Sequence, residues 1–200
     1  MVRMDAGDAT IRAYEARADR YLAAHRSPVG DVLAWQDRFG ALVPDGGRVL
    51  ELGSGPGTDA DRLEALGLRV LRSDATAAFA DRLRAIGHAV LDLDVRRDPI
   101  PEALDAVFAN AVLLHLDRDE LATALLRIHA ALEPAGVLAC TLKEGDGEEW
   151  HDRKLGVPRH FTYWREQPLR TALEQAGFTV LSIEHSQGAT EPWLQVLARA

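Results

Sequence analysis

The sequence predicts an α/β protein built on one doubly wound sheet of seven strands, mostly parallel, in which the last strand runs antiparallel. Short apolar runs alternate with helical segments from residue 48 onward, a pattern typical of parallel strands joined by right-handed helical crossovers. The last two apolar runs, at 178–183 and 193–197, are too close in sequence for such a crossover, so we expect them to pair antiparallel. The chain has 200 residues, which fit a single core.

The N-terminal part of the chain predicts two amphipathic helices. Residues 8–26 place apolar side chains at helical spacing among charged ones. Residues 29–42 repeat that pattern and stop at the Pro-Asp-Gly-Gly turn that begins at Pro44. We therefore expect residues 1–45 to form a helical cap and residues 46–200 to form the core that holds the sheet.

The parallel strands and the helices between them have recognisable limits. The predicted strands are 49–52, 69–71, 89–91, 106–109 and 137–142. Expected N-caps are Thr58, Thr76 and Asp117, the last with Glu120 three residues on, and expected left-handed glycines after helices are Gly67, Gly87 and Gly177. After Asp117 the apolar residues repeat near the helical period and should pack on the sheet: Leu121, Leu125, Ile128 and Leu132.

Residues 143–161 are rich in charge and glycine and show no apolar period. The segment is longer than most connections in a compact domain, and it follows the fifth strand, so it starts at the carboxyl edge of the sheet. We expect a mobile lid or substrate loop there, with a long solvated surface loop as the alternative. A final helix is expected at 168–176.

Composition excludes several classes of protein. Acidic residues outnumber basic ones by 31 to 23 and the formal net charge is -8, which disfavours nucleic acid as a partner. Cys140 is the one cysteine, it lies in an apolar strand, and no His/Cys cluster is present, so we expect neither a disulfide nor a metal site. No apolar stretch is long enough to cross a membrane and no secretory signal is evident, so a cytoplasmic protein is expected.

The strand at 49–52 runs into a glycine turn that opens a helix. The turn reads Gly53-Ser54-Gly55-Pro56-Gly57, whereas a dinucleotide fingerprint would need its third glycine at Thr58. Glu51 stands two residues before the first glycine, where a carboxylate suits a cationic ligand better than a pyrophosphate. The pattern therefore favours S-adenosylmethionine over a nicotinamide dinucleotide.

Together with the segments that follow, this turn resembles the class I S-adenosylmethionine-dependent methyltransferases, from residue 48 to residue 200. Asp74 ends the second strand 17 residues after Gly57, and Asp94-Val95 follows the third. Asn110 follows the fourth strand, 132–138 resembles the family's turn into strand five with Ala135 in place of a glycine, and Gly177-Phe178 resembles the start of strand six. The resemblance implies a Rossmann-like fold.

The resemblance also implies a set of cofactor-binding residues. Asp74 would hold both ribose hydroxyls, since a carboxylate has two acceptor oxygens, and Asp94 with the Val95 N–H would read the adenine, with Asp92 as a rival. Tyr21 of the first helix would touch the cofactor carboxylate, unless it is a core residue. The complete expected set is Tyr21, Glu51, Gly53, Ser54, Gly55, Gly57, Asp74, Ala75, Asp94, Val95 and Asn110.

Residues for the methyl acceptor are harder to find. His115 is a candidate general base, although a histidine at a leucine-rich helix start is more often packed or capping. Candidate substrate contacts are Tyr14, Lys143, Arg159 and Tyr163.

The expected reaction is an in-line methyl transfer to a small-molecule acceptor. The leaving sulfur is already cationic, so the protein needs chiefly to position the two reactants and a dedicated base is not required. The alternatives are an RNA-modifying methyltransferase, which the net charge disfavours, and a non-catalytic module that binds S-adenosylmethionine. The acceptor atom and the oligomeric state are not predicted.

Overall fold

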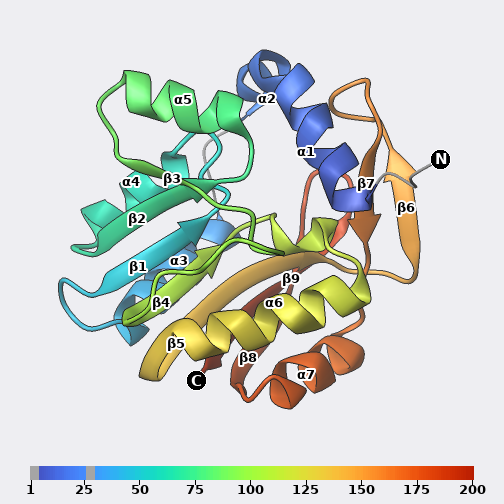
Figure 1. The fold of residues 1–200 in the computed structure, drawn as a ribbon. Coiled ribbons are helices and arrows are strands. Elements are labelled where there is room, and N and C mark those ends of the chain that lie inside the picture. The colour runs from blue at the N-terminus through green and yellow to red at the C-terminus, as the bar shows by residue number, and fades with distance from the viewer. Residues whose placement is uncertain (1–4, 26–29) are drawn as a thin grey trace.

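The computed structural model describes residues 5–25 and 30–200, and it confirms the predicted seven-stranded sheet (Figure 1). The strand order is β3-β2-β1-β4-β5-β9-β8. Neighbours from β3 to β5 are parallel, whereas β9 runs antiparallel to both β5 and β8. The strands are β1 (Arg48–Leu52), β2 (Arg69–Asp74), β3 (Val90–Asp92), β4 (Leu104–Ala109), β5 (Leu132–Lys143), β8 (Thr179–Gln187) and β9 (Pro192–Arg199).

The strand order reverses beside β1. The chain moves from β1 outward to β2 and β3, then returns to β4 on the other side of β1 and continues to β5. In an open parallel sheet, ligands bind in the crevice that this reversal opens at the carboxyl ends of the strands. The fold therefore places a binding crevice above β1, β2 and β4.

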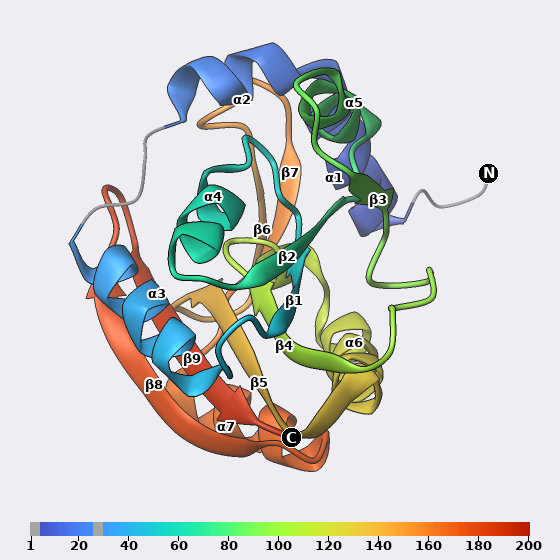
Figure 2. The ribbon, with the colours of Figure 1, turned by 90° about the vertical axis from the view of Figure 1, so that its left-hand side faces the viewer.

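Helices cover both faces of the sheet. α6 (Arg118–Ala131) and α7 (Glu166–Gln175) pack on one face, where the predicted apolar residues Leu121, Leu125 and Ile128 of α6 are confirmed as part of the core. Leu132, predicted with them, is buried there too but follows the helix and begins β5. α3 (Asp31–Leu42) and α4 (Thr58–Ala65) pack on the opposite face, where Trp35 and Phe39 are fully buried against Phe108. Figure 2 shows α3 and α6 on opposite sides of β4. α5 (Ala77–Ala85) packs against β3.

The helix ends agree with the sequence at most positions. Asp117 forms the predicted capping box with Glu120 (2.8 and 3.0 Å), and Gly67, Gly87 and Gly177 all have positive φ. Thr58 is not the N-cap of α4. Gly57 takes that place in the left-handed conformation, so the helix begins at Thr58 itself.

The first predicted helix is interrupted. It forms α1 (Ala6–Ala16) and α2 (Ala18–Ala24), because Arg17 leaves the helical conformation at φ -134° and ψ 23°. No glycine or proline marks this break. It accompanies a tertiary contact in which the rings of Tyr14 and Tyr21 meet edge to face, 5.4 Å apart, and both pack near Phe79 of α5. The expected start of the second helix at residue 29 lies outside the described residues.

The segment at 143–161 is not the irregular loop that its composition predicts. It contains β6 (Glu148–His151) and β7 (Arg159–Thr162), which pair antiparallel as a hairpin separate from the main sheet. Aromatic and charged contacts stabilise the hairpin in place of an apolar period: the His151 ring stacks on Phe161 with centroids 4.0 Å apart. Figure 1 shows the hairpin standing beside α1, and β7 packs against this helix.

Strand β5 also begins earlier than predicted. The residues expected to form a turn at 133–136 instead form an irregularity in the pairing, since Leu104 pairs with Leu132 but Ala106 pairs with Val137. Ala135, which stands where the resembled family has a glycine, has a φ of 67°. Ala135 is therefore a non-glycine residue in a strained, left-handed backbone conformation, at the position where the resembled family has a glycine.

Candidate active site

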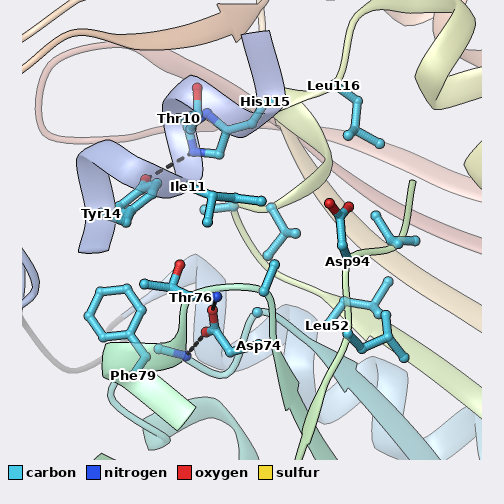
Figure 3. A pocket seen from close by; sticks show the side chains of 18 of the residues that line it. Thr10, Ile11, Tyr14, Leu52, Asp74, Thr76, Phe79, Asp94, His115 and Leu116 are labelled. Atoms are coloured by element: carbon cyan, nitrogen blue, oxygen red, sulfur yellow. Dashed lines mark hydrogen bonds between the residues drawn. The ribbon is translucent and has the colours of Figure 1, made fainter. Parts of the chain in front are cut away.

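A cavity opens at the carboxyl ends of β1, β2 and β4. Its walls come from the sheet edge, α1, α5 and η1 (Leu113–His115). Ten of the residues predicted from the sequence line it: Tyr14, Tyr21, Gly53, Gly55, Asp74, Ala75, Asp94, Val95, Asn110 and His115. Figure 3 shows the Tyr14–His115 pair on one side of this cavity and Asp74 on another.

Gly55 leaves the cavity open at the glycine turn. Its φ is 49°, and a Cβ added there would have no neighbour closer than 3.9 Å. Gly53 differs, because a Cβ on it would lie 2.5 Å from Val112. A side chain at position 55 would therefore fill ligand space, whereas one at position 53 would disturb the wall.

Asp74 presents a buried carboxylate to the cavity. Its two oxygens each accept one backbone N–H at 2.8 Å, from Gly55 and from Thr76. Each carboxylate oxygen has a second lone pair, so acceptor capacity remains on both. Burial raises the pKa of Asp74 above the usual range of an aspartate, and a ligand that donates hydrogen bonds to the ionised form would offset that cost.

Asp94 lines the cavity, but its carboxylate is already occupied. Although burial acts in the other direction, hydrogen bonds from Arg96 and Arg97 hold the pKa of Asp94 below its usual range. The Arg96 guanidinium also pairs with Asp5 and Asp8, which ties the start of α1 to the end of β3. Sequence reasoning missed Arg96; the signal available was an arginine two residues after the expected adenine-binding acid.

Asp92, the rival to Asp94, lies elsewhere. Its side chain is 72% exposed and pairs with Arg84 at 2.8 Å. It does not line this cavity.

Glu51, Ser54 and Gly57 lie behind the cavity wall. Glu51 is buried and accepts a hydrogen bond from the Ser54 hydroxyl. Burial raises the pKa of Glu51 to about 8, so this carboxyl retains its proton at neutral pH. The predicted direct contact between Glu51 and a cationic ligand does not follow from this position.

Asn110 is held by hydrogen bonds to two side chains. Its amide nitrogen donates to Asp59 (2.9 Å) and its amide oxygen accepts from the Thr141 hydroxyl (2.8 Å). Asp59 also accepts from Gln36 (2.8 Å). These bonds leave the side chain little freedom, so it shapes the floor of the cavity next to Gly53.

Tyr14, His115 and Arg159 form a chain of hydrogen bonds beside the cavity. His115 Nδ1 lies 2.6 Å from the carbonyl oxygen of His160, so that nitrogen must carry the proton. Burial lowers the pKa of His115 to about 3, so the ring is neutral. Its Nε2 accepts a hydrogen bond from the Tyr14 hydroxyl, whose oxygen lies 2.9 Å away. Arg159 Nη1 donates to the same hydroxyl oxygen at 2.8 Å.

The other candidate substrate residues do not line the cavity. Lys143 is buried, pairs with Glu191 at 2.7 Å and lies 3.7 Å from the ring centre of Phe161. The Tyr163 hydroxyl donates to Glu149 at 3.0 Å. Both residues contact the β6–β7 hairpin. Arg159 does not line the cavity either, but it donates a hydrogen bond to Tyr14, which does.

Within residues 5–25 and 30–200, no group of three or more His, Cys, Asp or Glu side chains is placed to hold a metal ion. In the same part of the chain, no helix has the length and apolar character needed to cross a membrane.

The fold and the position of this cavity define a Rossmann-like protein of the class I methyltransferase type. A family model described as "Methyltransferase domain" matches residues 21–183, and the chain belongs to that family. No curated relative matches the chain in sequence.

Several solved structures share the fold at low sequence identity. The 1,6-didemethyltoxoflavin-N1-methyltransferase of Burkholderia thailandensis, solved with 1,6-didemethyltoxoflavin and S-adenosylhomocysteine, is 22% identical with a TM-score of 0.71, over 100% of this chain and 92% of that one. The CcbJ methyltransferase of Streptomyces caelestis is 18% identical with a TM-score of 0.75, over 94% and 98% of the two chains. The N-methyltransferase NodS of Bradyrhizobium japonicum, solved with S-adenosylhomocysteine, is 20% identical with a TM-score of 0.68, over 96% and 98%.

Proposed function

We propose that the protein transfers a methyl group from S-adenosylmethionine to a small-molecule acceptor. The observation that carries this proposal is the Asp74 carboxylate, buried in the cavity wall with acceptor capacity on both oxygens and beside a glycine that leaves ligand space open. A vicinal diol donates two hydrogen bonds and would match that carboxylate. The residues present therefore fit the ribose of S-adenosylmethionine.

When bound, S-adenosylmethionine supplies an electrophilic methyl group on a cationic sulfur that leaves as a neutral thioether. The chain's own contribution is to bind, orient and exclude water. Asp74 and the Gly53–Gly55 backbone would hold the nucleoside, with Asp94 and Val95 beside the adenine. Because its carboxylate is paired with two arginines, Asp94 would contribute mainly by fixing the Val95 backbone.

Tyr14 is the polar group that we assign to the acceptor side. Its hydroxyl proton is directed to His115 and its oxygen accepts from Arg159, so the oxygen can accept a hydrogen bond from an acceptor N–H or O–H. His115 orients Tyr14. Because the pKa of His115 is low, its ring would not stay protonated after taking a proton from the acceptor. We therefore propose that His115 positions Tyr14 and does not act as a general base.

The shape and charge of the site support a small acceptor over RNA. α1 lines one wall of the cavity and β7 packs against α1, and the chain has a net charge of -8, which would repel a phosphate backbone. The toxoflavin-precursor methyltransferase that shares the fold acts on a small molecule by its name. That likeness adds support for the same class of acceptor.

The proposal is tested by calorimetric titration with S-adenosylhomocysteine, followed by a turnover screen. The screen uses methyl-labelled S-adenosylmethionine with a panel of phenols, amines and carboxylic acids, and Asp74→Ala serves as the inactive control. We expect saturable binding and label transfer to at least one compound. A protein that does not bind S-adenosylhomocysteine contradicts the proposal, and binding without transfer to any panel member supports the non-catalytic alternative.

A further inference from the structure

Arg159 is a buried cation without an anionic partner among the residues that the structure describes. Its relative exposure is 4%, and its one hydrogen bond among the described residues goes to the neutral Tyr14 hydroxyl. No described residue forms an ion pair with it, and residues 1–4 and 26–29 contain neither Asp nor Glu. The positive charge is therefore not balanced by any carboxylate of the chain.

One edge of the Arg159 guanidinium has no partner. Nη1 is used by Tyr14, whereas Nε is buried without a hydrogen bond and Nη2 makes none to any residue that the structure describes. The Nε–H and one Nη2–H of a guanidinium point in the same direction. This is an edge that binds the two oxygens of a carboxylate side by side.

The neighbouring charges strengthen the positive excess. Lys154 places its Nζ 4.0 Å from the ring centre of Tyr21 and forms no ion pair within residues 5–25 and 30–200. The carboxylates of the hairpin are already engaged, Glu148 with His160 and Glu149 with Arg153. Burial, together with Arg159 and Lys143, lowers the pKa of Lys154, which reflects the same lack of negative charge.

Aromatic contacts offset only part of the free-energy cost of burying the Arg159 charge. The guanidinium carbon of Arg159 lies 5.1 Å from the ring centre of Tyr14 and 5.0 Å from that of Phe161. Cation–π contacts of this kind are weaker than the hydration that a buried guanidinium loses. A residue that is buried at such a cost and hydrogen-bonded to a side chain of a binding cavity is a candidate for ligand recognition.

We propose that the methyl acceptor is a small organic acid whose carboxylate binds the Nε–Nη2 edge of Arg159, beside Tyr14, with Lys154 adding positive charge. This inference rests on the proposed function and names its substrate class. Because Tyr14, His115 and Phe161 present rings around Arg159, aromatic acids are suitable probes.

The test compares three acids with their neutral amides on protein saturated with S-adenosylhomocysteine. The pairs are benzoate and benzamide, 4-hydroxybenzoate and 4-hydroxybenzamide, and indole-3-acetate and indole-3-acetamide, and binding is measured by calorimetry. We expect at least one acid to bind about tenfold or more tightly than its amide, since a hydrogen-bonded charge pair contributes about that much. The preference should vanish in Arg159→Met and persist in Arg153→Met, which removes an exposed arginine from the same segment.

Each result decides a separate point. The proposal is overturned if no acid binds better than its amide, or if the acid preference survives in Arg159→Met. Should that variant fail to fold, Lys154→Met must still reduce the acid preference by about threefold, and an unchanged preference overturns the proposal. Failure of S-adenosylhomocysteine to bind counts against the proposed function. The affinities of the acids and amides can still be measured on the protein without S-adenosylhomocysteine, so the two failures are distinguishable.

Discussion

The two sides of the cavity bury opposite kinds of group. On the side of the glycine turn the buried groups are acids, and burial raises the pKa of Asp74 and of Glu51. On the side of the β6–β7 hairpin they are bases, and burial lowers the pKa of His115 and of Lys143. The acidic side suits a ligand that donates hydrogen bonds, and the basic side suits one that accepts them. This difference supports the proposal that S-adenosylmethionine and its acceptor bind on opposite sides of one cavity.

The largest expected effect is that of Gly55→Val on the acidic side. The branched side chain would occupy the open space beside Asp74, and S-adenosylhomocysteine binding should be lost. Gly67→Val is the matched control, because Gly67 also has a positive φ (88°) with open space around it but lies at the end of α4. Calorimetry on both variants, with folding checked by circular dichroism, measures the effect. Retained affinity in folded Gly55→Val would remove the glycine turn from the site.

Asp74→Ala should weaken S-adenosylhomocysteine binding by about 100-fold while the fold is kept. Two charge-assisted hydrogen bonds at about 1.5 kcal/mol or more each account for a loss of this size. Asp92→Ala is the control, since it removes an exposed carboxylate from the neighbouring strand, and its dissociation constant should stay within about twofold. Equal losses in the two variants would show that the effect is one of overall charge.

Tyr14→Phe tests whether the two sides act separately. The substitution keeps the ring but removes the hydroxyl that joins His115 to Arg159. With the acceptor found in the turnover screen, kcat should fall by about tenfold or more, and the dissociation constant of S-adenosylhomocysteine should stay within about twofold. A loss of S-adenosylhomocysteine affinity with kcat unchanged would place Tyr14 on the cofactor side.

A separate prediction concerns stability rather than binding: the pH dependence of unfolding due to Glu51. Its pKa is about 8 in the fold against 4.5 for an ordinary glutamate, so between these values the unfolded chain releases a proton that the folded chain keeps. Stability is therefore lost as the pH rises through this window. Glu51→Gln removes this titration, so its melting temperature relative to the wild type should increase between about pH 5 and about pH 8. A constant difference would show that Glu51 is ionised in the fold.

The acidic side could be predicted from the sequence because its parts are local. The glycine turn and Asp74 come from one strand, one helix and the next strand, and the parallel pairing of β1 with β2 brings them together. Gly55 and Asp74 are 19 residues apart in the chain and share a hydrogen bond. Residue types and spacing were sufficient to predict which of these residues line the cavity. They did not reveal that Arg96 and Arg97 donate hydrogen bonds to the Asp94 carboxylate.

The basic side could not be predicted in the same way. Tyr14 meets His115 and Arg159 across separations of 101 and 145 residues, and no spacing rule covers such contacts. The hairpin that carries Arg159 is not recognisable from the sequence, because its strands read Glu-Glu-Trp-His and Arg-His-Phe-Thr and lack the alternation of apolar and polar side chains that marks a strand. The break at Arg17 also follows from ring packing rather than from a glycine or proline.

A crystal structure of the complex with S-adenosylhomocysteine tests the central claim most directly. The account predicts that both ribose hydroxyls lie within about 3 Å of the Asp74 carboxylate oxygens and that the sulfur faces the Tyr14 hydroxyl. A ribose bound away from Asp74, or a sulfur directed away from Tyr14, would contradict the division of the cavity into a cofactor side and an acceptor side.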